Sequence, residues 1–142
     1  MSKLQRVAAI VIGMLVLAGC STTMDSLSVG DCFNGPEASY VGTEVSDVDV
    51  VDCSEPHRYE IYAAKEMTNS SFPGDNQAAN MADDYCLSRF QSYVGMEYTY
   101  SIYYISSAVP TSGSWSQGDR SIQCALGLEF GKKVGSARNS RE

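Results

Sequence analysis

The sequence predicts an α+β domain in which one helix packs on a mainly antiparallel sheet, in the order β-β-β-α-β-β, closed by two disulfides. Two observations predict this class. Stretches rich in β-branched and aromatic residues lie on both sides of a single long helical pattern. Four cysteines are also spread over these stretches, in a chain that begins with an export signal.

The first segment, "MSKLQRVAAIVIGMLVLAGC", is typical of a secretory signal peptide. Lys3 and Arg6 precede an apolar run over 7–17, and the small residues Ala18 and Gly19 follow it. The run is shorter than the about 20 apolar residues that a spanning helix needs. We therefore expect 1–19 to be a signal peptide that is absent from the mature protein.

The end of this segment, "LAGC" at 17–20, resembles the bacterial lipobox. In lipoproteins of that type, cleavage leaves Cys20 as the new N-terminus with lipid on its sulfur and usually a fatty acyl group such as palmitate on its amine. An ordinary signal peptide with a chance cysteine is the alternative. The lipobox predicts that Cys20 anchors the protein to the cell membrane on its extracytoplasmic face.

Removal of the signal peptide leaves about 120 residues, a length suited to one domain. The polar stretch "STTMDSLS" predicts a lipidated tether over 20–28, followed by the domain at 29–131. The last segment, "KKVGSARNSRE" at 132–142, is basic and is expected to be a flexible, solvated tail.

The charge of the chain limits its partners. The formal net charge is −7, and the signal peptide removes two positive charges from the mature protein. Nucleic-acid binding depends on Lys and Arg that neutralise phosphates. We therefore expect no nucleic-acid partner.

Three strands are expected before the helix. "VGDCF" at 29–33 is the first. In the second, "VSDVDVVDC" at 45–53, Asp47 and Asp49 lie on the face opposite to the predicted buried residues, which are Val45, Val48 and Val50. In the third, "PHRYEIYAAKEM" at 56–67, the same alternation predicts burial of Tyr59, Ile61 and Ala63.

A helix is expected over 76–94. Asp75 can cap it, because its side-chain oxygen can accept from first-turn amides, and Gly95 ends it. An apolar stripe at helical spacing is formed by Ala79, Ala82, Cys86 and Phe90.

Two more strands follow the helix. "YTYSIYYISSAVP" at 98–110 is rich in aromatic and β-branched residues, and "RSIQCALGLEF" at 120–130 alternates apolar with other residues. A glycine and serine loop that carries the single tryptophan, Trp115, joins them.

Four cysteines remain once Cys20 is lipidated, and an exported chain favours their oxidation. Three pairings are possible. We favour Cys32 with Cys53, which flank a candidate hairpin, and Cys86 with Cys124, which would tie the helix to the last strand. Zinc is the other use of such residues, but the chain has no C-x-x-C motif and no closely spaced histidines. We therefore expect no metal and no cofactor.

His57, the single histidine, raises the question of catalysis. It follows Cys53 by four residues and lies near Asp52 and Glu55. Imidazole titrates near neutral pH and is the commonest metal ligand. A small envelope hydrolase with His57 as base is one hypothesis, although "SWSQG" around Ser116 lacks the first glycine of G-x-S-x-G. The other hypothesis makes His57 part of the scaffold.

Aromatic residues suggest a second candidate site. Aromatic side chains can stack on sugars or peptides. Such a surface would be formed by Tyr98, Tyr100, Tyr103, Tyr104 and Trp115. The alternative is that these residues fill and border the sheet. The candidate binding residues are therefore Trp115 and His57.

Five segments, in order, carry a family resemblance. They are "VGDCF", "VDCSEPHRYEIYA", "FPGD", the helix with Cys86, and "PTSGSWSQGDRSIQCAL". Together they resemble the septum formation family of actinobacterial envelope proteins. The resemblance implies a non-catalytic extracytoplasmic domain, often tethered to the membrane, in which His57 belongs to a structural signature. Envelope or division proteins are the partners it suggests.

Overall fold

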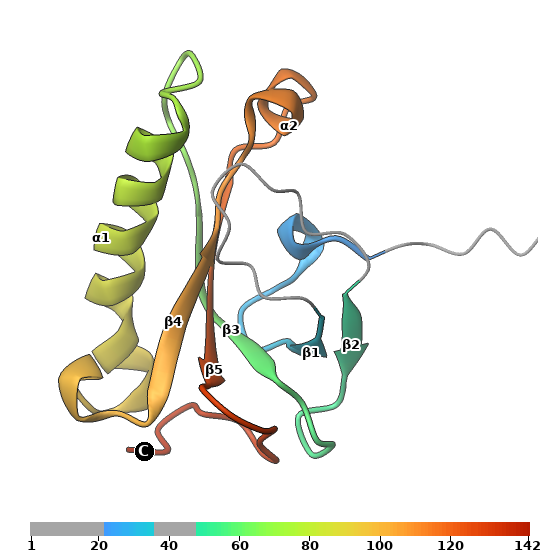
Figure 1. Cartoon of the computed structure of the whole chain (residues 1–142), viewed down its shortest axis with the longest axis vertical. Coiled ribbons are helices and arrows are strands. Elements are labelled where there is room, and N and C mark those ends of the chain that lie inside the picture. Colours follow the sequence, from blue (N-terminus) through green and yellow to red (C-terminus); the bar gives the residue numbers. More distant parts are fainter. Residues whose placement is uncertain (1–21, 36–47) are drawn as a thin grey trace, which may run out of the picture.

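The computed structural model describes residues 22–35 and 48–142, which form one five-stranded antiparallel sheet with the strand order β2-β1-β3-β5-β4 (Figure 1). The strands are β1 (Cys32–Asn34), β2 (Asp49–Val51), β3 (Tyr59–Glu66), β4 (Tyr103–Ala108) and β5 (Ser121–Leu128). The main helix is α1 (Asp75–Val94), and the short helices are η1 (Met24–Ser26), η2 (Tyr98–Tyr100) and α2 (Ser112–Ser116). The predicted α+β class and the predicted order of the main elements along the chain, β-β-β-α-β-β, are confirmed.

Helix α1 covers one face of the sheet and contacts β3, β4 and β5 (Figure 1). Its buried positions are Ala78, Ala82, Cys86, Phe90, Tyr93 and Val94. The predicted stripe is therefore right from Ala82 onward but wrong at Ala79, which is only partly buried, because Ala78 lies one turn before Ala82 on the packed face. Two phenols fasten the helix to β3: Tyr62 donates to the Cys86 carbonyl, and Tyr85 donates to the Ala64 carbonyl, each across 2.8 Å.

The ends of α1 differ in how well the sequence predicts them. Gly95 adopts the left-handed conformation (φ 82°), and its N–H donates to the Gln91 carbonyl, so the predicted end is confirmed. The N-cap is Gly74, and Asp75 is the first helical residue without a side-chain capping bond. Asp75 still places a carboxylate in the first turn, where the helix dipole favours negative charge.

A second core lies on the other face of the sheet and includes residues expected in the tether. Met24 and Leu27 are buried there with Phe33, Tyr59 and Ile61. The Gln123 amide donates to the Leu27 carbonyl across 3.0 Å. Within the described residues, the prediction of a free tether is wrong from Met24 onward, because the two apolar side chains in this otherwise polar stretch find a place in the core.

Strand β2 is short and half-exposed. Val48, just before it, is buried as predicted, whereas Val50 is 45% exposed, so its predicted burial is wrong. Within the described residues, strand β2 lies at the edge of the sheet beyond β1, with no further strand paired to its outer side. Val45 and Asp47 lie outside the described residues.

Strand β3 is central and buried on both faces. Tyr59, Ile61 and Ala63 are buried as predicted, but Glu60 and Tyr62 on the opposite face are buried too. An irregularity in the pairing with β5 lies between Ile61 and Ala63.

Both predicted disulfides are confirmed. Cys32 is bonded to Cys53, which joins β1 to the segment after β2. Cys86 is bonded to Cys124, which joins α1 to β5. By the chain-entropy model, loops of these lengths stabilise the fold by roughly 3 to 4 kcal/mol each.

The predicted glycine and serine loop contains the short helix α2. Thr111 and Ser114 form a capping box at its start, in which each side chain meets the other's backbone N–H. Trp115 is 8% exposed. The Arg120 guanidinium lies 3.6 Å from the centre of its ring.

The C-terminal segment is packed, so its prediction as a flexible tail over 132–142 is wrong. His57 and Lys133 exchange two backbone hydrogen bonds of 2.9 Å each. Ala137 is fully buried, and Arg141 N–H donates to the Val94 carbonyl across 3.0 Å. The basic composition concealed this packing because backbone groups, one small apolar side chain and a few polar side chains make the contacts.

Candidate functional site

His57 is fully buried immediately before β3. Its Nδ1 lies 2.8 Å from the Glu55 carbonyl oxygen. A carbonyl can only accept, so Nδ1 carries the hydrogen in the neutral ring and Nε2 is the free acceptor. Nε2 is buried and has no hydrogen-bond partner among the described residues.

Glu60 is the centre of a buried polar cluster. Its Oε1 accepts from the Tyr93 hydroxyl at 2.7 Å and from the Ser136 hydroxyl, and its Oε2 accepts from the Ala137 N–H at 2.7 Å. The Lys133 ammonium lies 3.8 Å from Oε2. Helix α1, strand β3 and the C-terminal segment therefore meet at one carboxylate.

Burial shifts several pKa values in this region. Desolvation lowers the pKa of Lys133, although Glu60 and Glu142 oppose that shift. Desolvation raises the pKa of Tyr93 to about 12, helped by its bond to Glu60. It also raises the pKa of Tyr103 to about 12, helped by the Tyr103 bond to Glu142.

The residues of the hydrolase hypothesis are not brought together. His57 lies at the end of the sheet where Tyr59 pairs with Gly127, whereas Ser116 lies on α2, near the opposite end of β5 (Figure 1). The exposed Ser116 hydroxyl donates to the Gly113 carbonyl at 2.7 Å.

The predicted aromatic surface is also divided. Trp115 packs near Phe72 at one end of β4, and Tyr103 begins β4 at the other end (Figure 1). Tyr98 contacts Phe90, while Tyr100 is 76% exposed. These aromatic side chains therefore do not form one stacking surface.

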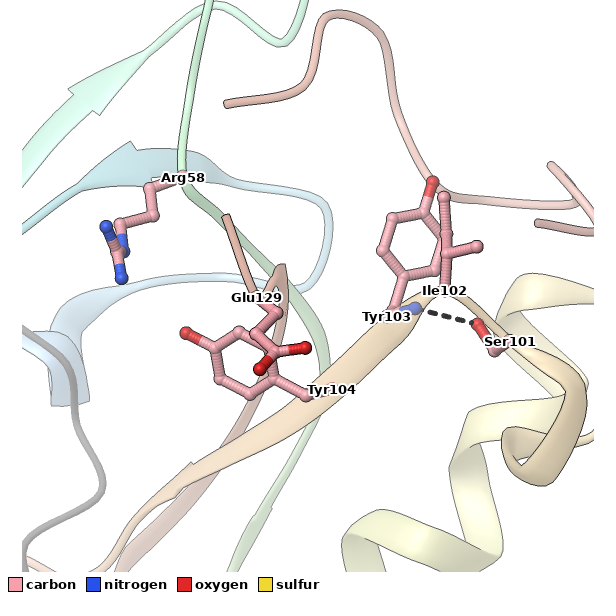
Figure 2. A pocket seen from close by; sticks show the side chains of 6 residues that line it. All are labelled: Arg58, Ser101, Ile102, Tyr103, Tyr104 and Glu129. Carbon is pink, nitrogen blue, oxygen red and sulfur yellow. Dashed lines mark hydrogen bonds between the residues drawn. The ribbon is translucent and has the colours of Figure 1, made fainter. Parts of the chain in front are cut away.

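An open groove of about 480 Å³ lies where β4 begins and β5 ends. It is lined by Arg58, Ser101, Ile102, Tyr103, Tyr104 and Glu129 (Figure 2). Figure 2 shows Arg58, Glu129 and Tyr104 on one side and Ile102, Tyr103 and Ser101 on the other. The groove therefore combines a cation, an anion, two phenols and an apolar side chain.

Arg58 is held in position by its neighbours. Its Nε donates to the Tyr59 hydroxyl across 3.0 Å, and the Tyr104 hydroxyl donates to the same oxygen across 3.2 Å. The bond to Tyr59 is the main cause that raises the pKa of Arg58 above its ordinary value. The guanidinium therefore stays charged at the groove.

Ile102 supplies the apolar part of the groove and is 60% exposed. Phe130 directly follows the lining residue Glu129 and is 82% exposed. Single exposed apolar side chains are common on protein surfaces. Ile102 and Phe130, however, are both neighbours in sequence of groove residues at the same end of the sheet.

A family model described as septum formation matches residues 29–141. The chain belongs to the septum formation family. The match begins at Val29, includes both disulfides, and extends through the C-terminal segment that packs on Glu60. Comparisons with curated proteins and with solved structures found no match.

Sequence reasoning missed most of the polar residues of this septum formation domain. Glu60 was expected on an outward face, and Lys133 was expected in a tail. An acidic residue within an otherwise apolar strand, flanked by Tyr59 and Ile61, was the one available indication of its burial. Arg58 and Glu129 carried no such indication, because they are separated by seventy residues and meet only through the pairing of β3 with β5.

None of the helices in the described part, 22–35 and 48–142, has the length and apolar character needed to cross a membrane. Cys20 and residues 1–19, which are expected to form a signal peptide, lie outside that part.

Proposed function

We propose that this septum formation domain is a non-catalytic interaction module, held at the extracytoplasmic face of the cell membrane by lipid on Cys20. Its groove binds a segment of an envelope or division protein that presents an apolar side chain beside a carboxylate. The observation that carries the proposal is the groove itself, in which the exposed Ile102 lies on one side and the charged Arg58 on the other (Figure 2). No ion pair of Arg58 with a carboxylate is found within residues 22–35 and 48–142, so its charge is available to a partner.

The burial of His57 supports a role without catalysis. A general base must come within hydrogen-bond reach of the proton that it removes from a substrate. His57 is fully buried and its Nδ1 is engaged by the Glu55 carbonyl. The Ser101 hydroxyl in the groove donates to the main-chain oxygen of Glu142 at 2.6 Å, and no histidine lies among the groove residues.

The packing of the N-terminal residues supports a specific orientation at the membrane. The Thr22 carbonyl accepts from Val48 N–H across 3.0 Å, and Met24 is buried. Two extended residues span about 7 Å. A lipid on Cys20 would therefore hold the Thr22 end of the domain close to the bilayer surface.

The groove is tested by crosslinking in cells that produce the full chain. A photoreactive amino acid replaces Ile102 in one strain and Leu87 in a control strain. Leu87 is 54% exposed on α1 and lies outside the groove. We expect a defined crosslinked protein from position 102 alone, lost when Arg58→Glu is added. Equal crosslinking from both positions, or no effect of Arg58→Glu, would contradict the proposed groove.

The anchor is tested separately. Cells are labelled with a fatty-acid analogue, and the wild-type protein is compared with Cys20→Ser. We expect label on the wild type and an unprocessed, unlabelled Cys20→Ser protein. Equal labelling of the two proteins would reject the lipid anchor and leave the groove proposal standing.

A further inference from the structure

A set of metal-ligating atoms meets beside the first disulfide. Cys32 Sγ, one ring nitrogen of His57 and one carboxylate oxygen of Glu60 all lie within 4.8 Å of one another. All three residues are buried. Cys53 is bonded to Cys32, so its sulfur lies directly beside this set.

The fold explains how two distant segments supply this set. Cys32 on β1 is the direct cross-strand partner of Glu60 on β3, so their side chains leave the sheet on the same face. His57 is fixed just before β3 by its two backbone bonds to Lys133. Cys32 lies 21 residues before Cys53, so the set does not form a recognisable zinc motif in the sequence.

His57 has the arrangement of a metal-binding imidazole. Histidine ligands usually donate the hydrogen of the other ring nitrogen to a carboxylate or a backbone carbonyl, which fixes the ring orientation. Nδ1 donates to the Glu55 carbonyl, and Nε2 is left buried with no hydrogen-bond partner in the described structure. A buried nitrogen without a partner is costly, and a cation on Nε2 would remove that cost.

The disulfide controls whether the sulfur atoms can act as ligands, because a metal binds thiolates. Cys53 is partly exposed, whereas Cys86 and Cys124 are both fully buried. A reductant in solution therefore reaches the first disulfide before the second.

We propose that reduction of the Cys32–Cys53 disulfide converts this cluster into a zinc site, with two thiolates, His57 Nε2 and Glu60 as the four ligands. A dithiol reductant supplies two electrons and two protons. The sulfur–sulfur bond breaks, two thiols form, and the reductant becomes a cyclic disulfide. Zinc binding then releases the two thiol protons to solvent.

The charges of the cluster suit a divalent cation. Two thiolates balance the two charges of zinc, and the Lys133 ammonium, 3.8 Å from Glu60, balances the carboxylate. Cys₂-His-carboxylate is a ligand set of the kind that zinc accepts in tetrahedral sites. Disulfide and metal thus exclude each other, and the redox state decides which of them links Cys53 to Cys32.

The experiment uses the purified mature domain with the Cys86–Cys124 disulfide intact, verified by peptide mapping after mild reduction with a water-soluble phosphine. Cobalt(II) is titrated as a spectroscopic substitute for zinc. We expect thiolate-to-cobalt charge-transfer absorption and the visible bands of tetrahedral cobalt in the reduced protein only, and zinc should displace the cobalt. His57→Gln should weaken cobalt binding at least about tenfold, and Cys32→Ser with Cys53→Ser should abolish the charge-transfer absorption.

Three results would overturn the proposal. One is equal cobalt binding by the oxidised and reduced proteins, because exposed carboxylates and not the thiolates would then bind the metal. Another is an equal affinity of the wild type and His57→Gln for cobalt, because the thiolates of an unfolded chain would then bind the metal without His57. The third is a reduced domain that has lost its circular dichroism signal and does not regain it with zinc. Wild-type folding with zinc that His57→Gln lacks would support the site.

Discussion

Tyr93 on α1 donates its hydroxyl hydrogen to Glu60 Oε1 on β3 across 2.7 Å, beneath the packed C-terminal segment. With the bonds that Ser136 and Ala137 donate to the same carboxylate, this contact joins three parts of the chain that the sequence places far apart. It also puts a negative charge inside the domain, where its donors and Lys133 must stabilise it. The stability of the domain therefore depends on polar residues as well as on its two apolar cores.

Glu60→Ala should lower the free energy of unfolding by about 3 to 5 kcal/mol, because it leaves the Lys133 charge buried without its partner. Urea unfolding of the mature domain measures this loss. Glu66→Ala, at the exposed end of the same strand, is the control and should change stability by less than about 0.5 kcal/mol. Equal effects of the two substitutions would contradict the role of Glu60.

Ala137→Asp should destabilise the domain strongly, because Ala137 is fully buried and an unpaired buried carboxylate is costly. Val134→Asp places the same charge on a residue that is 65% exposed in the same segment and should have little effect. Thermal unfolding compares the two. If both variants have the melting temperature of the wild type, the C-terminal segment does not pack on the domain in solution.

The domain should lose stability as the pH rises from about 10 to about 12. Tyr93 and Tyr103 have an ordinary pKa of 10.0 when unfolded and a pKa of about 12 when folded, so the folded state holds more protons in this interval. Their contribution is complete below pH 10 and is lost as the pH passes the folded value. Lys133 acts in the opposite sense, because its folded pKa is lowered from 10.5.

Urea unfolding across this interval checks the prediction. The slope of the free energy of unfolding against pH is set by how many more protons the folded state binds than the unfolded state. Tyr93→Phe and Tyr103→Phe should each lower that number by about one. Tyr100→Phe, at a side chain that is 76% exposed, is the control. Unchanged slopes in both variants would show that these hydroxyls titrate alike in the two states.

His57→Ala should lower the melting temperature and leave partner crosslinking from the groove nearly intact. The substitution removes the bond from Nδ1 to the Glu55 carbonyl, worth about 1 kcal/mol, and leaves a cavity in a buried position. Glu55→Ala is the control, since it keeps that carbonyl. Thermal unfolding is paired with complementation in cells at matched protein level. Unchanged stability with complete loss of function would instead indicate catalysis by His57.

Gly127→Ala should destabilise the domain by about 1 to 3 kcal/mol through overpacking. A Cβ at this position would lie 3.0 Å from both the Arg58 carbonyl oxygen and Tyr59 Cδ1. Ser121→Ala on the same strand is the control. Because Tyr59 and Arg58 support the groove, the variant should also weaken crosslinking from position 102. A stable variant with normal crosslinking would contradict this close packing.

The sequence by itself determined the elements whose causes are local. Helical spacing and Gly95 fixed α1 and its end, and the alternation around Ile61 and Ile122 identified the long strands. The sequence also favoured both observed disulfide pairings among the three that were possible. Cys32 and Cys53 flank a candidate hairpin, and Cys86 with Cys124 ties the predicted helix to the last predicted strand. These inferences need only residue types and short spacings.

Only the tertiary structure decided the rest. Glu60 is buried because the C-terminal segment covers the face of β3 that alternation assigns to solvent, and Lys133 is there because backbone bonds to His57 hold it. Arg58 lines the same groove as Glu129 because the pairing of β3 with β5 brings these distant residues together. Such contacts depend on which segments the fold brings together, and backbone hydrogen bonds leave almost no trace in composition or periodicity.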